Sequence, residues 1–516
     1  MPIVWARVIE LSGTGLSADD VVAVARDGAE VALSAEARAA MEASAAVVAG
    51  LADRSEPAYG VSTGFGSLAN VAIPVDRREE LQRALVRSHA AGMGPPVEPE
   101  VVRAMMLLRA RTLAMGCSGA RPVVAETILA LLNAHITPVV PEFGSLGASG
   151  DLAPLAHCAL VLIGEGDVSG PGGAPAPAAP ALAAAGVAPV TLGPKEGLAL
   201  INGTDGMLGM LILAIHDLGR LLRVADITAA MLVEALLGTD RVFAEDLVAL
   251  RPHDGQAASA ANLRRVLAGS PIVASHRYGD DRVQDAYSLR CAPQVNGAAR
   301  DTVAHAERVA AAELASAIDN PMVLPDGRVE SCGNFHGAPL GFALDFLAIA
   351  VAEVGGIAER RTDRLLDAAR SQGLPPFLTT EAGVNSGLMI AQYTQAALVA
   401  ENRRLAAPAS VGSLPTSAMQ EDHVSMGWSA ARKLRTALDN LARILAVELS
   451  CAAHGLDLRA PLEPGPGGAA ALAAVRARIA GPGPDRRVAP DLAAAEQLVA
   501  SGMVQDAVEA AVGAMA

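Results

Sequence analysis

Apolar residues along most of this chain recur at helical spacing, and the alternation typical of strands is scarce. Leu434, Leu438, Leu441, Leu445 and Leu449 follow one another at intervals of 4, 3, 4 and 4 residues. That spacing places the five side chains on one stripe of a helix. The pattern as a whole predicts a mainly α-helical protein.

Two other segments are apolar on nearly every face. Pro339–Glu359 has only Asp345 and Glu353 as charged residues before its end, and Val101–Met115 is interrupted by three arginines. A helix without a polar face has to be buried among other helices. We therefore expect a long central helical bundle.

Stretches rich in proline and glycine mark the predicted joints. Gly166–Pro194 is expected to be an exposed excursion, and Leu462–Gly468 and Gly481–Asp485 to be loops between short C-terminal helices. Strand signals are few, so any sheet is expected to be small and to lie near the N-terminus, at Val4–Leu11. The expected organisation has three regions: a smaller N-terminal α+β region over residues 1–115, the central bundle over 116–430 and a helical region over 431–516.

Composition narrows the class of protein. Hydrophobic residues make up 52% of the 516 residues, which is too many for a disordered chain. The 40 Lys and Arg against 55 Asp and Glu give a net charge of −15, which argues against nucleic-acid binding as a main role. The longest charge-free run, Val168–Pro194, is rich in proline and glycine and predicts no membrane span.

The cysteines and the N-terminus indicate the cytoplasm. Arg7 and Glu10 interrupt the unbroken apolar core that a signal peptide would need. The five cysteines are odd in number and scattered, and no CxxC pair occurs. This usage is typical of a reducing compartment and predicts neither a disulfide framework nor a metal site.

The most unusual segment is Gly144–Leu155, with the sequence GSLGASGDLAPL. A nucleophile elbow fails because Asp151 stands where the second glycine is required. A dinucleotide loop fails because no GxGxxG and no βαβ pattern surround the segment. One remaining interpretation is a glycine-rich helix start capped by Asp151.

The other remaining interpretation is self-cyclisation of the backbone. The amide nitrogen of Gly150 would attack the carbonyl carbon of Ala148 and close a five-membered ring with loss of water. Loss of the Ser149 hydroxyl as a second water would leave an electrophilic methylidene. The small Ala148 and the flexible Gly150 suit such a tight closure, and the local sequence leaves both interpretations open.

With other segments of the chain, this stretch resembles the aromatic amino acid ammonia-lyases, in which Ala-Ser-Gly forms the 4-methylidene-imidazol-5-one (MIO) group. The resemblance extends from about Val8 to Ala453. It implies a homotetramer with active sites drawn from three chains and no dissociable cofactor. It also implies a tyrosine loop within residues 1–115 and the MIO loop within 116–430. The other matching segments are Tyr59–Gly66, Arg87–Gly92, Leu198–Thr204, Gln284–Arg290, Gly333–Gly337 and Gln420–Gly427.

The resemblance implies elimination of ammonia from an α-amino acid, with the MIO group making the amino group a better leaving group. Tyr59 matches the base that removes the β-proton. Its ordinary pKa is about 10, so we expect positive or hydrogen-bonding partners near it. Arg290 matches the clamp on the substrate carboxylate. The positions that match the lining of the ring and the substrate are Asn202, Gln284, Tyr287 and Phe335, with Tyr287 also expected to be catalytic.

Ser88, His89 and Glu421 predict the substrate. Family members that act on phenylalanine or tyrosine resemble one another in having Phe-Leu or His-Leu at the first pair and an uncharged amide at the third position. Here Ser88 leaves room, His89 offers a polar ring, and Glu421 can accept a hydrogen bond from an imidazole. A carboxylate against a bare phenyl ring would be buried without a partner. The pattern predicts L-histidine as substrate, with trans-urocanate and ammonia as products, in the first step of histidine degradation.

Other interpretations stay open. One is a tyrosine or phenylalanine ammonia-lyase, or an MIO aminomutase, on the same scaffold. Another is a catalytically silent helical scaffold. A fumarase-type lyase is disfavoured because its Gly-Ser-Ser-x-Met-Pro-x-Lys-x-Asn loop is absent from the sequence. The sequence assigns no role to Gly166–Pro194 or to the tail after Ala453, and does not decide whether Glu421 also transfers protons.

Overall fold

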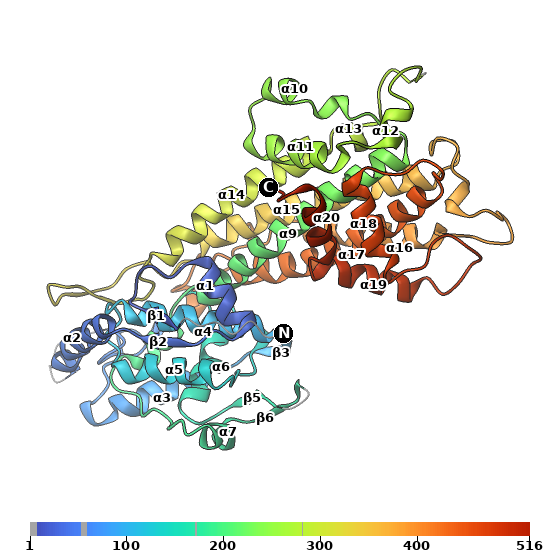
Figure 1. Cartoon of the computed structure of the whole chain (residues 1–516). Coiled ribbons are helices and arrows are strands. Elements are labelled where there is room, and N and C mark those ends of the chain that lie inside the picture. The colour runs from blue at the N-terminus through green and yellow to red at the C-terminus, as the bar shows by residue number, and fades with distance from the viewer. Residues whose placement is uncertain (1–7, 53–58, 171–172, 281) are drawn as a thin grey trace. The chain divides into compact units, whose positions relative to one another are not determined.

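The computed structural model describes residues 8–52, 59–170, 173–280 and 282–516, and within them the chain is mainly helical, as predicted (Figure 1). The chain forms two compact units, each assembled from three stretches. Unit 1 comprises Met1–Leu213, Glu307–Leu344 and Pro408–Arg432; unit 2 comprises Ala214–Ala306, Asp345–Ala407 and Lys433–Ala516. The three-region division expected from the sequence stays a prediction.

Unit 1 contains short helices and strands from the N-terminal part of the chain. Its α-helices are α1 (Ala18–Val22), α2 (Ala35–Ala52), α3 (Arg78–His89), α4 (Pro99–Ala114), α5 (Pro122–Asn133), α6 (Leu152–Leu162), α7 (Ala178–Ala184) and α8 (Glu196–Ile201). Its strands are β1 (Ile9–Leu11), β2 (Val31–Leu33), β3 (Met93–Pro96), β4 (Pro141–Phe143), β5 (Asp167–Ser169), β6 (Pro175–Pro177), β7 (Met322–Val323) and β8 (Val329–Glu330). Single turns of π- or 3₁₀-helix are η1 (Ala23–Asp27), η2 (Gly66–Leu68), η3 (Val75–Arg77) and η7 (Ser417–Met419).

Four long helices have residues in both units: α9 (Asp205–Ala235), α14 (Ala292–Leu314), α15 (Ala338–Leu366) and α17 (Gly427–Asp457). The elements of unit 2 alone are η5 (Arg241–Phe243), α10 (Glu245–Ala249), α11 (Asp254–Leu267), α12 (Pro271–Ser275), α13 (Tyr287–Arg290), η6 (Pro376–Leu378), α16 (Met389–Leu405), α18 (Pro466–Arg476), α19 (Ala489–Ala500) and α20 (Met503–Val512).

The strands pair two by two, so the prediction of small sheets is confirmed. β1 and β2 are parallel and the other three pairs are antiparallel. β1 matches the end of the strand predicted at Val4–Leu11, whose residues 4–7 lie outside the described part of the chain. The expectation that strands would lie only near the N-terminus is wrong. Strands of two to four residues carry too little alternation to be seen in the sequence.

Two expectations about loops need correction. Gly166–Pro194 was expected as an exposed excursion, but β5, β6 and α7 form within it and Val168 and Leu182 are buried. Its residues 171–172 lie outside the described residues. Leu462–Gly468 is not a loop throughout, because α18 begins at Pro466, and proline is well suited to the first turn of a helix. Gly481–Asp485 is outside any helix or strand, as predicted.

Helix α4 is buried on every face, which confirms the expectation for Val101–Met115. Every residue from Val101 to Ala114 is buried, including the three arginines. Each arginine donates to backbone carbonyls: Arg103 to those of Val24 and Leu132, Arg109 to those of Ala199, Asn202 and Ile318, and Arg111 to those of Glu313 and Ser316. Burial lowers the pKa of Arg111 to about 10. These arginines therefore join α4 to distant segments of unit 1.

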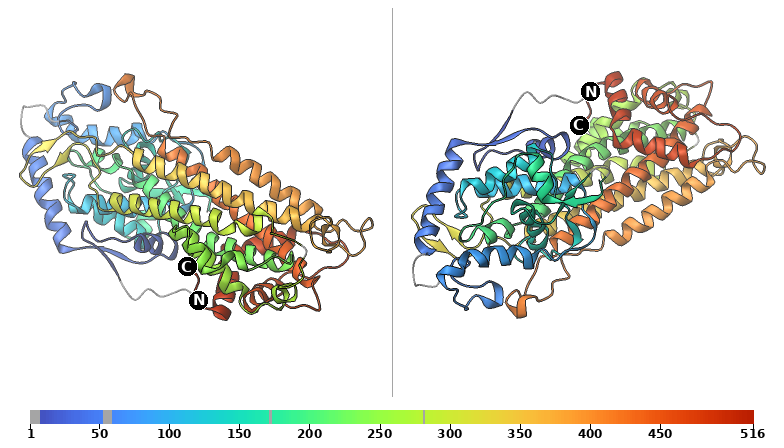
Figure 2. Two further views of the ribbon diagram at one scale, coloured as in Figure 1. Left: turned by 90° about the horizontal axis from the view of Figure 1, so that it is seen from above. Right: turned by 90° about the horizontal axis from the view of Figure 1, so that it is seen from below.

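Unit 2 contains a bundle of long helices, in which α16 lies at the edge beside α15 and α17 (Figure 2). The predicted leucine stripe lies on α17 and is buried along its whole length. Inside the bundle, Arg361 and Glu448 form a fully buried ion pair with 2.6 Å between Nε and Oε1. The hydroxyl of Thr228 donates to the other oxygen of Glu448 at 2.6 Å.

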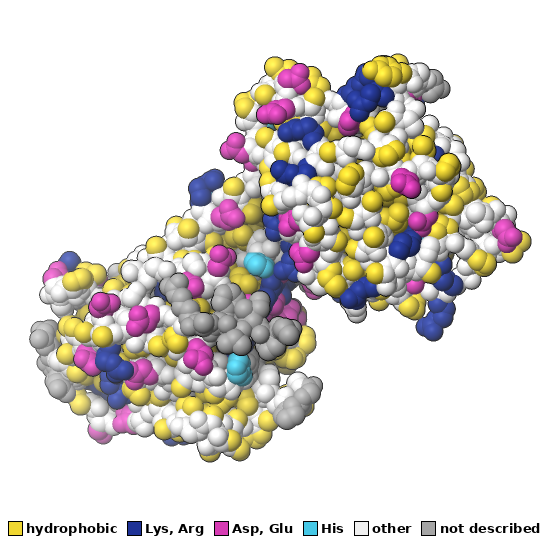
Figure 3. Space-filling model, in the orientation of Figure 1, with side chains coloured by type: hydrophobic (Ala, Val, Ile, Leu, Met, Phe, Trp, Pro, Cys, Tyr) yellow, Lys and Arg dark blue, Asp and Glu magenta, His cyan; other side chains and the backbone are white. Residues whose placement is uncertain are grey.

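Helix α15 is long and apolar enough to cross a membrane by length and composition. However, 56% of its most apolar window is buried inside the protein, and core helices of globular proteins pass the same test. On the face drawn in Figure 3, acidic and basic side chains are interspersed over each unit. The burial of its apolar window agrees with α15 being a core helix of a globular protein.

Candidate active site

Unit 1 holds two adjoining cavities, of about 520 and 470 Å³. Tyr59, Ser149 and Glu421 line both of them. The larger cavity is otherwise mostly apolar. The predicted site residues that line one or both cavities are Tyr59, His89, Ala148, Ser149, Asn202, Phe335 and Glu421. Residues separated by more than 300 positions in the sequence thus meet around one space.

The loop that carries Ala148, Ser149 and Gly150 is fixed by polar contacts on both sides. The hydroxyl of Ser145 donates to a side-chain oxygen of Asp151 at 3.0 Å and accepts from the backbone N–H of Gly147. The hydroxyl of Ser425 donates to the carbonyl of Gly147 at 3.1 Å. Ala148 and Gly150 are buried, whereas Ser149 is partly exposed to the cavities.

Gly150 occupies a place that no other residue fits. Its φ is +76°, in the left-handed region, and a Cβ would overlap the carbonyl oxygen of Gly203. The backbone N–H of Asp151 donates to that same carbonyl at 2.6 Å. The chain at residues 148–150 is therefore bent sharply and pressed against the Asn202–Thr204 segment.

Asp151 does not cap the helix that follows it. It occupies the N-cap position of α6, but its side chain makes no cap hydrogen bond there. Instead one carboxylate oxygen accepts from the backbone N–H of Met207 at 2.9 Å, in the first turn of α9. Full burial raises its pKa to about 7. The predicted helix start is therefore confirmed, with Asp151 in the N-cap position, but the predicted side-chain cap is wrong, since the Asp151 carboxylate binds a different helix.

Tyr59 begins a tight turn at the edge of both cavities. Its hydroxyl accepts a hydrogen bond from the backbone N–H of Gly66 at 3.2 Å. Burial and, to a smaller extent, the nearby Glu421 raise the pKa of Tyr59, whereas the Gly66 hydrogen bond lowers it. In the described parts of the chain, no Lys or Arg lines either cavity. Unit 1 thus supplies the expected hydrogen bond to Tyr59, and its described cavity-lining residues include no Lys or Arg.

His89 lies at the end of α3 with one ring nitrogen occupied. Its Nδ1 lies 3.0 Å from the carbonyl oxygen of Leu85. Because a carbonyl only accepts, Nδ1 carries the proton and Nε2 is left as an acceptor. Burial lowers the pKa of His89, so the ring is neutral near pH 7. The neighbouring Ser88 also lines the larger cavity.

Glu421 is held by a short hairpin. Thr416 and Glu421 pair through backbone hydrogen bonds, and the hydroxyl of Thr416 donates to Oε2 of Glu421 at 2.7 Å. Ser417, Ala418 and Met419 all have φ between 50° and 70°. Three consecutive non-glycine residues in the left-handed region are strained, and such strain occurs most often at functional sites.

Gln284, Tyr287 and Arg290 belong to unit 2 and do not line these two cavities. Gln284 and Tyr287 are exposed. The Arg290 guanidinium lies 4.6 Å from the centroid of the Tyr287 ring, in a cation–π arrangement. Its Nε is buried and has no hydrogen-bond partner among the described residues.

Several residues of the site have no signal in the sequence. Gln82 is fully buried, donates to the carbonyl of Gly60 and accepts from the backbone N–H of Gly197, so it joins the Tyr59 turn to α8. Lys195 and Asp319 form a buried ion pair across 124 positions of sequence. A lone glutamine or lysine is usually exposed, and no local pattern reveals so distant a partner.

Comparison with known proteins gives the class. The chain belongs to the aromatic amino acid lyase family, whose profile matches residues 16–477. It is 64% identical over 508 residues to a histidine ammonia-lyase of Streptomyces coelicolor, with 98% of this chain and 99% of the relative covered.

Two solved structures agree with this fold. A histidine ammonia-lyase from Trypanosoma cruzi superposes with a TM-score of 0.90 at 40% identity and covers 98% of this chain and 96% of that one. A tyrosine aminomutase from Streptomyces globisporus superposes with a TM-score of 0.94 at 38% identity and covers 99% and 100%. Structural similarity thus spans more than one activity, whereas the higher sequence identity is to a histidine ammonia-lyase.

Proposed function

We propose that this protein is a carbon–nitrogen lyase that eliminates ammonia from L-histidine and forms trans-urocanate. The observation that carries the proposal is that His89 and Glu421 line the same cavity as Ser149. An imidazole has both a ring N–H and a ring acceptor. It can donate to the Glu421 carboxylate or to Nε2 of His89, whereas a phenyl ring offers the buried end of Glu421 no hydrogen bond beyond the one from Thr416.

We infer that Ala148, Ser149 and Gly150 condense into the MIO group. The sharp bend at Gly150, the space left only for glycine there and the exposure of Ser149 to both cavities fit this ring. Ser149 brings the hydroxyl that has to be lost. When formed, the group supplies an electrophilic carbon, which no ordinary side chain offers.

The chain's own residues divide the remaining work. Tyr59 accepts the β-proton at its phenolate oxygen, and the Gly66 N–H stabilises that oxygen. Phe335 lines the smaller cavity together with residues 148 and 149. Asn202 holds the amino group, as argued below. Glu421 orients the imidazole, and whether it also moves a proton is tested by the pH profile of Glu421→Gln.

No Lys or Arg of the described residues lines these cavities, which favours a carboxylate clamp from elsewhere. We propose that Gln284, Tyr287 and Arg290 of another copy complete the site. The exposed Tyr287 ring and the unpartnered Nε of Arg290 support this role. The arginine also supplies the positive charge that would lower the raised pKa of Tyr59.

We propose a homotetramer in the cytoplasm. In unit 2, α15 exposes Phe346 and Ile349, and α16 exposes Ile390 and Tyr393. Large apolar side chains in such number on neighbouring long helices are typical of contact surfaces between subunits. Mass measurement in solution distinguishes a tetramer from a monomer, and a monomer with full activity would contradict shared active sites.

Turnover of single amino acids tests the function. Purified protein is given L-histidine, L-tyrosine or L-phenylalanine, and the arylacrylate and β-amino acid products are separated and quantified. Histidine should give urocanate fastest, with no β-amino acid. The high structural similarity to a tyrosine aminomutase favours one alternative, and a β-tyrosine product, or faster turnover of tyrosine, would support it.

A further inference from the structure

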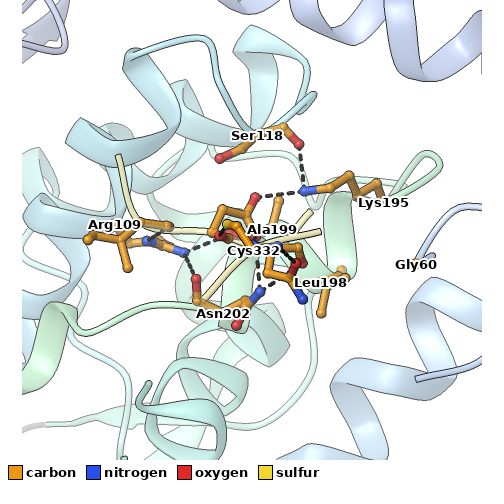
Figure 4. Close-up of polar contacts among 12 residues, drawn as sticks. Gly60, Arg109, Ser118, Lys195, Leu198, Ala199, Asn202 and Cys332 are labelled. Atoms are coloured by element: carbon orange, nitrogen blue, oxygen red, sulfur yellow. Dashed lines mark hydrogen bonds and ion pairs between the residues drawn. The ribbon is translucent and has the colours of Figure 1, made fainter. Parts of the chain in front are cut away.

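A buried ion pair contacts a residue of the larger cavity. Nζ of Lys195 lies 2.7 Å from Oδ2 of Asp319 and donates to the carbonyl of Ser118 at 3.0 Å. The other oxygen of Asp319 accepts from the side-chain nitrogen of Asn202 at 3.2 Å. Lys195, Ser118 and Asn202 gather in one polar cluster (Figure 4). The pair is therefore one hydrogen bond away from a cavity-lining side chain.

These contacts determine which way the Asn202 amide points. Its NH₂ group faces the Asp319 carboxylate and, at 2.9 Å, the carbonyl oxygen of Asn320. Both are acceptors that cannot donate, so the amide has only one favourable orientation. The amide oxygen is buried and has no hydrogen-bond partner within the described chain.

An unpartnered buried acceptor is unfavourable unless a ligand satisfies it. Asn202 lines the larger cavity together with Ser149. An α-amino acid that reacts at residue 149 brings N–H donors to this place. The orientation of Asn202 is thus the one that matches an amino group.

The backbone around the pair is also held in an unusual state. Lys195 has φ +66° although it is not a glycine, and it is fully buried. Arg109 donates to the carbonyls of Ala199 and Asn202, both at 3.0 Å, and so fixes the main chain on the other side (Figure 4). A strained residue persists only where its surroundings hold it, often at a functional site.

We propose that Lys195 and Asp319 are positioning residues, which hold the amide oxygen of Asn202 toward the amino group of the substrate. The proposal rests on the proposed function, because it needs an amino acid in this cavity. The Lys195 cation keeps a carboxylate beside it, and the carboxylate accepts from Asn202. Neither side chain of the pair lines the cavities, so both act through Asn202.

Asp319→Asn tests the proposal with almost no change of shape. The new side chain has one acceptor oxygen in place of two. When that oxygen is drawn to the Lys195 cation, its NH₂ group faces the NH₂ of Asn202 and the backbone N–H of Asn320, both of which donate to Asp319 in the wild type. Asn202 then loses the hydrogen bond from its amide to Asp319 and is displaced. We expect kcat to fall about 10²-fold, the scale of a misplaced reacting group, with a smaller change in KM. In an Asn202→Ala background, the same substitution should cause little further loss, because the two residues act as one unit.

A neutral pair provides the rescue. In Lys195→Met/Asp319→Asn no cation attracts the amide oxygen, which can again accept from Asn202, so part of the lost kcat should return. If Asp319→Asn does not fold, the double variant takes its place in the mutant cycle. Its effect on kcat is then measured once with Asn202 intact and once in the Asn202→Ala background. Thermal unfolding and intact mass report separately whether each variant is folded and whether its loop has lost two waters.

If Asp319→Asn lowers kcat by the same factor in the Asn202→Ala background as in wild type, the proposal is overturned. A Lys195→Met/Asp319→Asn variant that is less active than Asp319→Asn would also overturn it. A variant that keeps its full linear mass would also overturn it, since the pair would then act in ring formation. Wild type is assayed first on each amino acid. If it prefers another substrate, the cycle is run with that one, so a wrong substrate assignment stays distinguishable from a wrong role for the pair.

Discussion

Two buried ion pairs of the same chemistry lie in different surroundings. Lys195–Asp319 in unit 1 and Arg361–Glu448 in unit 2 are both at most 1% exposed. In each pair the second carboxylate oxygen accepts from a neutral side chain, which is Asn202 in the first and Thr228 in the second. Asn202 lines a cavity, whereas Thr228 is enclosed in the bundle.

The comparison shows that burial of an ion pair does not by itself reveal its role. A buried pair is weak grounds for stability, because removing two charges from water offsets much of their attraction. The neutral side chain that accepts its orientation from the pair says more about the role of the pair than its burial does. We therefore expect the Lys195–Asp319 pair to affect mainly turnover and the Arg361–Glu448 pair to affect mainly folding.

Among the variants considered, Ser149→Ala should cause the largest loss of activity, and the effects of the other site variants are compared with it. It removes the hydroxyl that ring formation needs but touches neither ion pair. Nearly all ammonia release should be lost while the melting temperature stays close to that of wild type. Wild-type rates in this variant would refute the assignment of the loop.

Glu448→Gln is the counterpart in the bundle. It leaves the buried Arg361 cation without a counter-charge, which should reduce the free energy of unfolding by about 3–5 kcal/mol. Chemical denaturation measures this loss, and kcat below the unfolding transition should stay within a few-fold of wild type. A loss of kcat as large as that of Asp319→Asn, with Asn202 untouched, would erase the distinction between the two pairs.

Glu421→Gln tests the imidazole pocket within unit 1. Loss of a charged acceptor for the substrate ring should weaken transition-state binding by about 1.5–3 kcal/mol, seen in kcat/KM for histidine. Phenylalanine and tyrosine should lose less, since they offer no imidazole N–H. An unchanged rate with histidine would show that the imidazole lies elsewhere.

Thr416→Val and Thr416→Ser form the matched control for that pocket. The valine is similar in shape but cannot donate to Glu421, and should lower kcat/KM for histidine by about 1 kcal/mol. The serine keeps the hydroxyl and should stay near wild type. Equal losses in both variants would point to the strained hairpin rather than to the hydrogen bond.

The buried Glu234 of unit 2 should give a smaller effect, on the pH dependence of stability. Burial raises the pKa of Glu234 to about 7, above its ordinary value of 4.5. The folded state therefore binds the proton more tightly, so the stabilisation is present at low pH and is lost as the pH rises from about 4.5 to 7. The melting temperature of wild type should fall across this window more than that of Glu234→Gln. Parallel curves for the two proteins would contradict this.

The fold was largely predictable from the sequence, because long segments with apolar residues at helical spacing specify long helices. The Leu434–Leu449 stripe and the charge-poor Pro339–Glu359 both lie in long helices, α17 and α15. The two-residue strands β7 and β8 and the buried Val168 left no such pattern, since their order depends on contacts with distant segments.

Several residues that line the candidate site were predictable from the sequence, whereas the residues that hold them in place were not. Tyr59, His89, Ser149 and Glu421 were found through motifs, and they meet at the cavities. Gln82, Lys195 and Asp319 were not found, because each is an ordinary polar residue whose partner lies far along the chain. The role of Arg290 stays a prediction, since it lies in unit 2.

The intact mass of the purified protein tests the central claim most directly, that residues 148–150 condense with one another. Wild type should be lighter than its linear sequence by two water molecules, and the deficit should map to the peptide that contains Ser149. Ser149→Ala, prepared in the same way, lacks the hydroxyl and should not show the two-water deficit. A wild-type mass equal to that of the linear chain, in a preparation that still releases ammonia from histidine, would contradict the account.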